Sequence, residues 1–313
     1  MGIFSKVQNS KGWMAIVIHP DRIDLACIKH TTGGRPEVLL LDSYKKEGGD
    51  TETLARLRKE LRLSGYRCIT LLHGGQYQML QVEAPAVPKG EIREAVRWRI
   101  KDMLEYSPTV ATIDVLEIPT QSTGNKQQLL VVAANNAIVG PRMQMFEDAK
   151  IPLDVIDTQE TAQRNISALF EIENRGLAFL AFDVNGGVLT FTHNGELYHS
   201  RRIEAPLSQL VQTQDNGRRQ KLFERVSLEM QRSLDYFDRE FSFIPLAKLV
   251  VMPLPDTPEF LEYLTENLYV PIESCDLAKV IDFPKIPELK NVARQSQCLH
   301  ALGAALRNEG AAT

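Results

Sequence analysis

The sequence predicts an α/β fold of two similar lobes, and three observations support this prediction. At 313 residues the chain is about twice the usual domain size, so two units are expected. Three strands, a helix and a further strand are predicted near the start, and this order recurs from residue 177. Repetition on this scale indicates an internal duplication and not a short-period repeat. We expect a first lobe over 13–156, a second over 157–294, and a C-terminal helix over 295–313 that packs back on the first lobe.

The first lobe opens with short strands joined by tight turns. The sequence His19–Arg22 has the Pro and Asp that are typical of a turn, and apolar runs lie on both sides of it. Asp50 is placed to cap the next helix, whose leucines recur at helical spacing. The predicted elements are the strands Met14–Ile18, Ile23–Lys29 and Glu37–Tyr44, the helix Thr51–Leu61 and the strand Cys68–Leu72.

An inserted subdomain is expected at about residues 84–135. Pro85–Pro88 breaks an extended segment, Gln76–Glu83, and an amphipathic helix follows. Its apolar face repeats every four residues, and the chain then passes through Tyr106-Ser107-Pro108 into a strand. The apolar face consists of Ile92, Val96, Ile100 and Leu104; the strands Ile113–Ile118 and Leu129–Ala134 are expected to pair around a polar turn at residues 122–128.

The remaining elements complete the first lobe and repeat its order in the second. The helix that starts after Thr158 has an N-terminal hydroxyl and an early Glu160, a capping pattern, and is expected to run to about Ile172. Asn194-Gly195 is a strong hairpin signal. We predict strands at Leu153–Ile156, Ala178–Asp183, Val188–His193, Leu197–Ile203 and Lys248–Met252, and helices at Ala137–Ala149, Phe223–Phe241, Pro258–Leu268 and Gln295–Arg307.

Composition excludes several classes of function. Hydrophobic residues at 43% and charged residues at 24% are ordinary for a folded globular protein, and a net charge of -4 provides no field that would gather nucleic acid. The four cysteines form no Cys-x-x-Cys pair and are expected to be buried thiols in a reducing cytoplasm. No secretory signal is visible, and no apolar stretch approaches the roughly 20 residues of a spanning helix, so membrane association is expected only through partners.

Four motifs, in order, resemble the PilM group of actin-like pilus-assembly proteins over nearly the whole chain. They are Ala95–Trp98 with Lys101-Asp102, Ile156-Asp157 with Glu160 and Arg164–Ile166, Leu234–Phe237, and Ala301–Arg307. The resemblance implies an actin-like (ribonuclease H-like) duplicated fold with a small inserted subdomain. It also implies a component of a type IV pilus platform at the inner-membrane face of a Gram-negative bacterium. A PilN-like inner-membrane protein, bound through its cytoplasmic tail, and a pilus assembly ATPase are the implied partners.

Actin-like folds hold ATP between two hairpins, each of which supplies an Asp and a close-approach glycine. In the first hairpin this pattern falls on Val17-Ile18-His19, so both groups are missing, and Asp21 and Asp24 are interpreted as a turn and a strand residue. The second hairpin resembles a degenerate phosphate loop, in which an Asn replaces the expected glycine and the Thr comes one place late. Its candidate cofactor-binding residues are Asp183, Asn185, Gly186, Gly187 and Thr190; a Gly-Gly turn without a ligand is the alternative interpretation.

Two further loops depart from the nucleotide-binding pattern. Glu204–Leu207 stands where the resemblance implies a glycine pair, and the adenosine-side loop reads Met252–Pro255, whose prolines have no amide donors. Losing one preorganised phosphate donor commonly costs orders of magnitude in rate. We therefore expect no catalysis and no cofactor, with ATP and Mg2+ binding weak at most. The alternative functions are an active actin-like ATPase, and the cytoplasmic domain of a GspL-like type II secretion protein.

Other constellations have plainer interpretations. His73-Gly74-Gly75 lacks the Lys-Ser or Lys-Thr of a P-loop and is expected to be a turn between strands. His193 and His199 flank a hairpin without a further ligand, so no metal site is assigned. Trp98 and Tyr106 combine apolar area with one polar atom, which suits the anchoring of a partner peptide, and core packing is the alternative for either residue.

Overall fold

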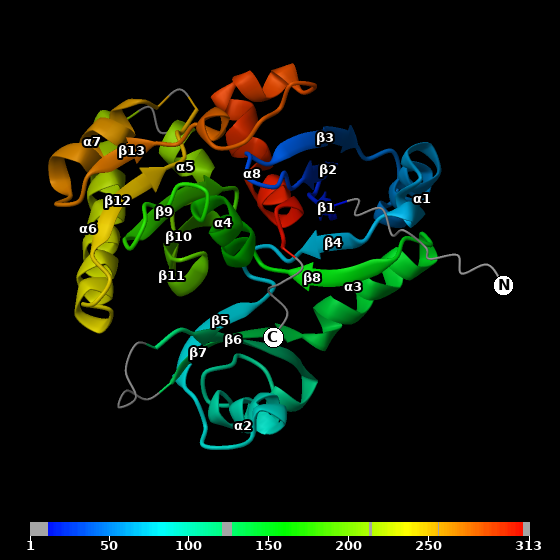
Figure 1. Cartoon of the computed structure of the whole chain (residues 1–313), viewed down its shortest axis with the longest axis horizontal. Helices are drawn as coiled ribbons and strands as arrows, with labels where there is room; N and C mark the ends of the chain where they lie inside the picture. The colour runs from blue at the N-terminus through cyan, green and yellow to red at the C-terminus, as the bar shows by residue number, and fades with distance from the viewer. Residues whose placement is uncertain (1–11, 121–126, 213–214, 256, 309–313) are drawn as a thin grey trace.

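The computed structural model describes residues 12–120, 127–212, 215–255 and 257–308. Its first lobe is built on a five-stranded sheet in the order β3-β2-β1-β4-β8 (Figure 1). The first three strands are antiparallel neighbours, whereas β4 and β8 run parallel to β1. The strands are β1 (Met14–Ile18), β2 (Arg22–Lys29), β3 (Glu37–Lys45), β4 (Cys68–Leu71) and β8 (Leu153–Asp157).

The second lobe repeats this architecture. Its sheet has the order β11-β10-β9-β12-β13, again with three antiparallel strands followed by two parallel ones. The predicted duplication is therefore confirmed. The strands are β9 (Gly176–Asp183), β10 (Gly186–His193), β11 (Glu196–Ile203), β12 (Leu246–Val251) and β13 (Ile272–Ser274). With only three residues, β13 is too short to show a periodic pattern and was not predicted.

Two helices lie between the sheets and join the lobes. α4 (Gln159–Ser167) and α8 (Val292–Ala305) pack along each other, and α8 also covers β1 and β2 of the first lobe (Figure 1). They approach so closely that a Cβ at Gly303 would lie 2.2 Å from the Ala162 carbonyl oxygen. The shared core contains apolar side chains of both sheets, so the lobes bury area against each other. Beyond α8, Arg307 forms an ion pair with Asp157 at 2.8 Å, which ties the chain to β8.

The inserted region forms a third sheet, in the order β5-β7-β6, and one face of it packs on α2. α2 (Ile92–Arg99) is shorter than predicted, because the backbone turns after Ile100 while Leu104 still packs on the same cluster. Arg97 donates from Nη1 to the carbonyl oxygens of Pro108 and Ala111, so the helix is held against the returning chain. The strands are β5 (Gln78–Glu83), β6 (Ala111–Ile118) and β7 (Gln128–Asn135); most of the predicted polar turn at 122–128 lies outside the described residues.

The other helices cover the outer faces of the sheets. They are α1 (Asp50–Leu61), α3 (Asn136–Asp148), α5 (Leu207–Gln212), α6 (Asn216–Glu240) and α7 (Glu259–Asn267). The cap of α1 is Gly49 and not Asp50, since the Gly49 amide donates to Glu52 and Asp50 is already helical. α6 starts seven residues before the predicted Phe223, capped by Asp215, and α4 ends at Ser167 instead of Ile172.

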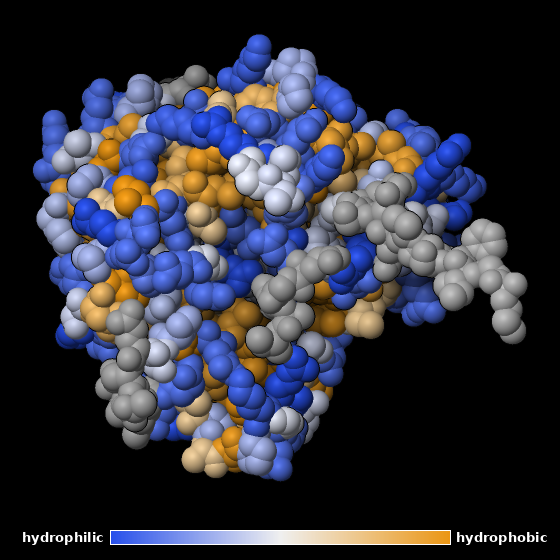
Figure 2. All heavy atoms as spheres, in the orientation of Figure 1, coloured by the Kyte–Doolittle hydropathy of each residue, from blue (hydrophilic) through white to orange (hydrophobic). Residues whose placement is uncertain are grey.

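Hydrophilic residues cover most of the face in Figure 2, with hydrophobic residues scattered among them. Across the described residues, no helix combines the length and the apolar composition that a bilayer crossing needs.

Candidate functional site

The second hairpin presents Asp183 at the end of β9, but its carboxylate is already engaged. One oxygen, Oδ1, accepts from the Asn185 amide at 2.7 Å within the turn. The other, Oδ2, accepts from the Gln159 side chain of α4 at 2.5 Å. One oxygen therefore stabilises the turn and the other holds the hairpin on α4, which leaves fewer lone pairs for a metal or its water ligands.

The two glycines of this hairpin are explained by close packing. Gly186 has φ +138, and a Cβ there would lie 2.6 Å from the Ile203 carbonyl oxygen of β11. A Cβ at Gly187 would lie 2.7 Å from the ring of Phe182. Thr190 is fully buried, and its hydroxyl accepts from the Gln163 amide of α4 at 2.9 Å. Of the five candidate residues, only Asn185 and the partly buried Asp183 reach the surface of the turn.

The first hairpin confirms the plain interpretation of its two aspartates. Asp21 is an exposed turn residue, whereas Asp24 is buried and receives hydrogen bonds from Ser43 Oγ at 2.5 Å and from Arg22. His19 Nε2 lies 2.9 Å from the same carboxylate. Burial raises the pKa of Asp24, but the bonds with His19 and Ser43 and the nearby charges outweigh burial, so its pKa lies below the ordinary value. This carboxylate is internally satisfied.

The side chain of Gln159 joins both lobes at the start of α4. Its Oε1 accepts from the Gly74 amide of the β4–β5 turn at 3.1 Å and from Arg202 of β11 at 3.3 Å. A Cβ at Gly74 would lie 2.3 Å from Arg202 Nη1, so the guanidinium occupies the space directly beside that glycine. An amide donor and a glycine, the two groups that could cradle an anion there, are already used by the protein.

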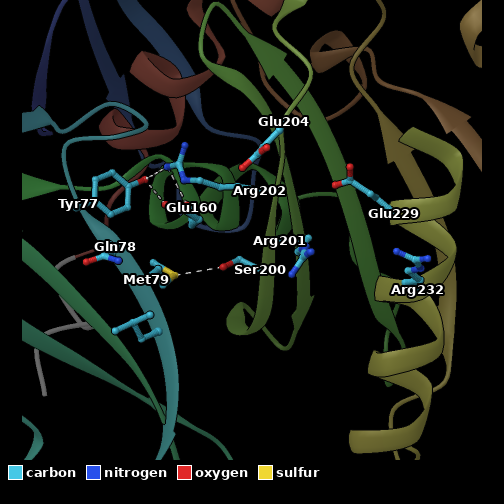
Figure 3. Close-up of a pocket in the computed structure, with 11 residues that line it drawn as sticks. Tyr77, Gln78, Met79, Glu160, Ser200, Arg201, Arg202, Glu204, Glu229 and Arg232 are labelled. Carbon is cyan, nitrogen blue, oxygen red and sulfur yellow. Dashed lines mark hydrogen bonds and ion pairs between the residues drawn. The ribbon is translucent and has the colours of Figure 1, made fainter. Parts of the chain in front are cut away.

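Arg202 also takes part in a triad with the buried side chains of Tyr77 and Glu160. Arg202 Nη2 lies 3.0 Å from Glu160 Oε1 and donates to the Tyr77 hydroxyl at 2.5 Å, while that hydroxyl donates to Glu160 (Figure 3). Glu160 is 1% exposed. Burial and the Glu160 charge raise the pKa of Tyr77 well above its usual value, so the phenol remains a neutral donor. The triad connects the β4–β5 turn, α4 and the second lobe.

Three histidines approach this junction without forming a metal site. The His19 and His73 rings are 5.2 Å apart, and His73 Nε2 lies 2.7 Å from the Ile18 carbonyl oxygen. Burial lowers the pKa of His300 to about 4, so this side chain is neutral at pH 7. No group of three or more His, Cys, Asp or Glu side chains within the described ranges could hold a metal ion.

The hairpin histidines lie apart from each other in the strand register, and the cysteines are buried. His193 is paired with Glu196, and His199 lies opposite Phe191, because a register shift separates the two pairs; they do not face each other across the hairpin. None of the four cysteines, all of which are described, forms a disulfide, and all are buried as predicted. Burial raises the pKa of Cys68, Cys275 and Cys298 to about 12, so these thiols stay protonated and unreactive.

The structure places the two candidate partner-binding residues in different environments. Trp98 is 54% exposed on α2, and its indole nitrogen donates to Glu94 at 3.1 Å. Tyr106 is half-buried and packs against the cluster between α2 and the third sheet. Trp98 is not part of that cluster, so its ring is the more exposed of the two.

A groove of about 590 Å³ lies between β5 of the inserted region and two elements of the second lobe, β11 and α6 (Figure 3). The Tyr77–Glu160–Arg202 triad is part of its lining. Most of the other lining side chains are polar or charged: Gln78, Ser200, Arg201, Glu204, Glu229 and Arg232, with Met79 and Leu80 as the apolar members.

Comparison with solved structures identifies the class of fold. The chain matches a structure described as the PilM-PilN type IV pilus biogenesis complex with a TM-score of 0.72 and 18% identity, covering 95% of this chain and 98% of that one. The cytoplasmic domain of EpsL, an inner-membrane component of the Vibrio cholerae type II secretion system, matches with a TM-score of 0.48 and 11% identity, over 91% and 94% of the two chains. No family model and no curated protein matches the sequence.

The predicted fold is confirmed: the protein has the actin-like, two-lobe fold. Sequence reasoning missed the side chains that join its lobes, namely Tyr77, Gln159 and Arg202. Each is an ordinary polar residue of a strand end or a first helical turn. Only Glu160, noted as an early helical acid, carried a sequence signal.

Proposed function

We propose that this protein is a non-catalytic scaffold of a type IV pilus assembly platform. In this role it lies at the cytoplasmic face of the inner membrane of a Gram-negative bacterium and docks the N-terminal tail of a PilN-like protein. Among pilus systems we assign it to the mannose-sensitive haemagglutinin (MSHA) type, in which its counterpart is MshI, on the four motifs from Ala95 to Arg307. A pilus assembly ATPase is the second partner in this proposal.

The observation that carries the non-catalytic part is that the protein's own side chains engage the second hairpin and the Gly74 turn. Gln159 bonds the Gly74 amide and the Asp183 carboxylate, and Arg202 fills the space beside Gly74. A triphosphate needs these same donors, glycines and carboxylates to be free. Binding it would require the interlobe network to open, at the cost of leaving the buried Glu160 without its cation.

The platform part of the proposal is supported by the shared architecture. The solved structure that matches 95% of the chain contains PilM with PilN. Here the inserted subdomain, which carries the exposed Trp98, provides an aromatic anchor for a short tail. The exposed ring of Trp98 offers a large apolar area to such a contact, while its indole nitrogen is oriented by Glu94.

Coexpression with candidate inner-membrane pilus proteins tests the docking role. We expect recovery of the complex with the full cytoplasmic tail, and loss when the first residues of the tail are trimmed. Trp98→Ala should weaken recovery, whereas Phe243→Ala, which removes another exposed aromatic side chain on the second lobe, should leave it unchanged. Recovery that does not depend on the tail would contradict the docking mechanism.

A further inference from the structure

The groove between β5, β11 and α6 exposes a strand edge. Among the strands that the structure describes, β11 ends its sheet and pairs with β10 alone, and β5 ends the third sheet. In the described residues, the β11 and β5 backbones form no hydrogen bond with each other, and side chains such as Met79 and Ser200 span the gap, at 3.3 Å between Sδ and Oγ (Figure 3). The free edge of β11 therefore has unpaired backbone donors and acceptors.

The walls of the groove carry charges without partners. Arg201 projects from β11, and Glu229 and Arg232 project from α6 toward it (Figure 3). Glu204 follows β11 at the same groove. Among the described side chains, none of these four forms a hydrogen bond or an ion pair through its charged group, in contrast to Arg202 and Glu160 deeper in the groove. Two positive and two negative groups are thus available to a ligand.

We propose that this groove binds an extended segment of a partner protein, which adds to the free edge of β11 and carries one acidic and one basic side chain on its α6-facing side. Successive residues of a strand face opposite sides, so charges at positions i and i+2 both reach Arg201, Arg232 and the two glutamates. The intervening residues face Met79 and Ser200. Backbone pairing supplies affinity and the charges select the sequence, as in strand addition elsewhere.

This groove is separate from the site proposed for tail docking at Trp98. Trp98 belongs to α2, which packs on one face of the third sheet, whereas the other face of that sheet packs on the second lobe. The polar lining also argues against a drug-like ligand, because such sites are mostly apolar. A strand edge with charges of both signs fits a polypeptide.

Fluorescence anisotropy with labelled hexapeptides tests the proposal on the full chain. The probe is Thr-Glu-Val-Lys-Thr-Val, together with the version in which Glu and Lys are exchanged, because a strand can add in either direction. We expect one of the two to bind, and the charge-reversal variant Arg201→Glu with Arg232→Glu to weaken it about tenfold or more. The peptide with Lys at both charged positions should bind this variant better than it binds the wild type.

Two controls separate strand addition from general charge attraction. Arg239→Glu, an exposed residue at the far end of α6, should leave the dissociation constant unchanged. N-methylation of alternate peptide amides should abolish binding for the set that faces β11 and preserve it for the other set. Absence of binding by both parent peptides, equal binding to the charge-reversal variant, or equal tolerance of both methylation patterns would overturn the proposal.

Discussion

Replacing Arg202 by Met removes the cation that compensates the buried Glu160. A fully buried ion pair broken on one side costs about 3–5 kcal/mol, because the remaining charge is left without compensation. Arg202 keeps 35% of its side chain exposed, and the Tyr77 hydroxyl would still donate to Glu160, so we reduce this figure to about 2–3 kcal/mol. In a chain of 313 residues that unfolds as one unit, such a loss lowers the melting temperature by roughly 3–5 °C.

A double-mutant cycle measured by urea unfolding at pH 7 tests whether the electrostatic pair is the cause. Glu160→Gln leaves a neutral amide in place of the carboxylate, so adding it to Arg202→Met should recover at least about 1 kcal/mol of the loss. The free energies of unfolding are valid if circular dichroism and fluorescence report the same transition, because the two lobes then unfold together in one two-state step. If the two changes are additive, or if the double variant is the least stable, the triad does not hold the lobes as described.

The remaining predictions concern packing and pH. Gly303→Ala should destabilise the protein by about 3 kcal/mol or more, because the new Cβ would meet the Ala162 carbonyl oxygen. The control Gly140→Ala in α3 has open space around it and should be neutral or slightly stabilising. Thermal melts of the two variants measure the difference. Burial and the Arg201 charge lower the pKa of His199 to about 4 in the folded protein. As the pH drops from about 6.5 to 4, the unfolded chain therefore takes up a proton at this histidine before the folded protein does, and the free energy of unfolding falls. His199→Gln should remove roughly 2–3 kcal/mol of this pH dependence in urea titrations at the two pH values, and an unchanged slope would contradict the assignment.

Local patterns predicted most of the elements. β1, for example, begins and ends at the predicted residues. A short uninterrupted apolar run that is followed by a Pro-Asp turn is typical of a buried strand. The start of α6 was missed because residues 216–222 are mostly polar and show no apolar stripe until Phe223. In the inserted region the apolar residues keep helical spacing past Arg99, where α2 ends. The spacing could not predict this end, at which the returning chain packs against the helix and accepts a hydrogen bond from Arg97.

The joining of the lobes was less predictable than the lobes themselves. Arg202 follows Arg201 in a strand, and only the packed structure shows that one turns toward Glu160 and the other toward α6 (Figure 3). Gly186 had a sequence signal, since a glycine after Asp-Val-Asn suggested a phosphate loop. The structure shows another reason for a glycine at this position, namely its close approach to Ile203, which the spacing of residues could not predict.

Isothermal titration of the protein with ATP and Mg2+, combined with a phosphate-release assay, tests whether the protein binds and hydrolyses a nucleotide. We expect no turnover and binding weaker than about millimolar, because Asp183, the Gly74 amide and the space beside Gly74 are occupied by Gln159, Asn185 and Arg202. Micromolar affinity accompanied by measurable ATP hydrolysis would contradict this expectation.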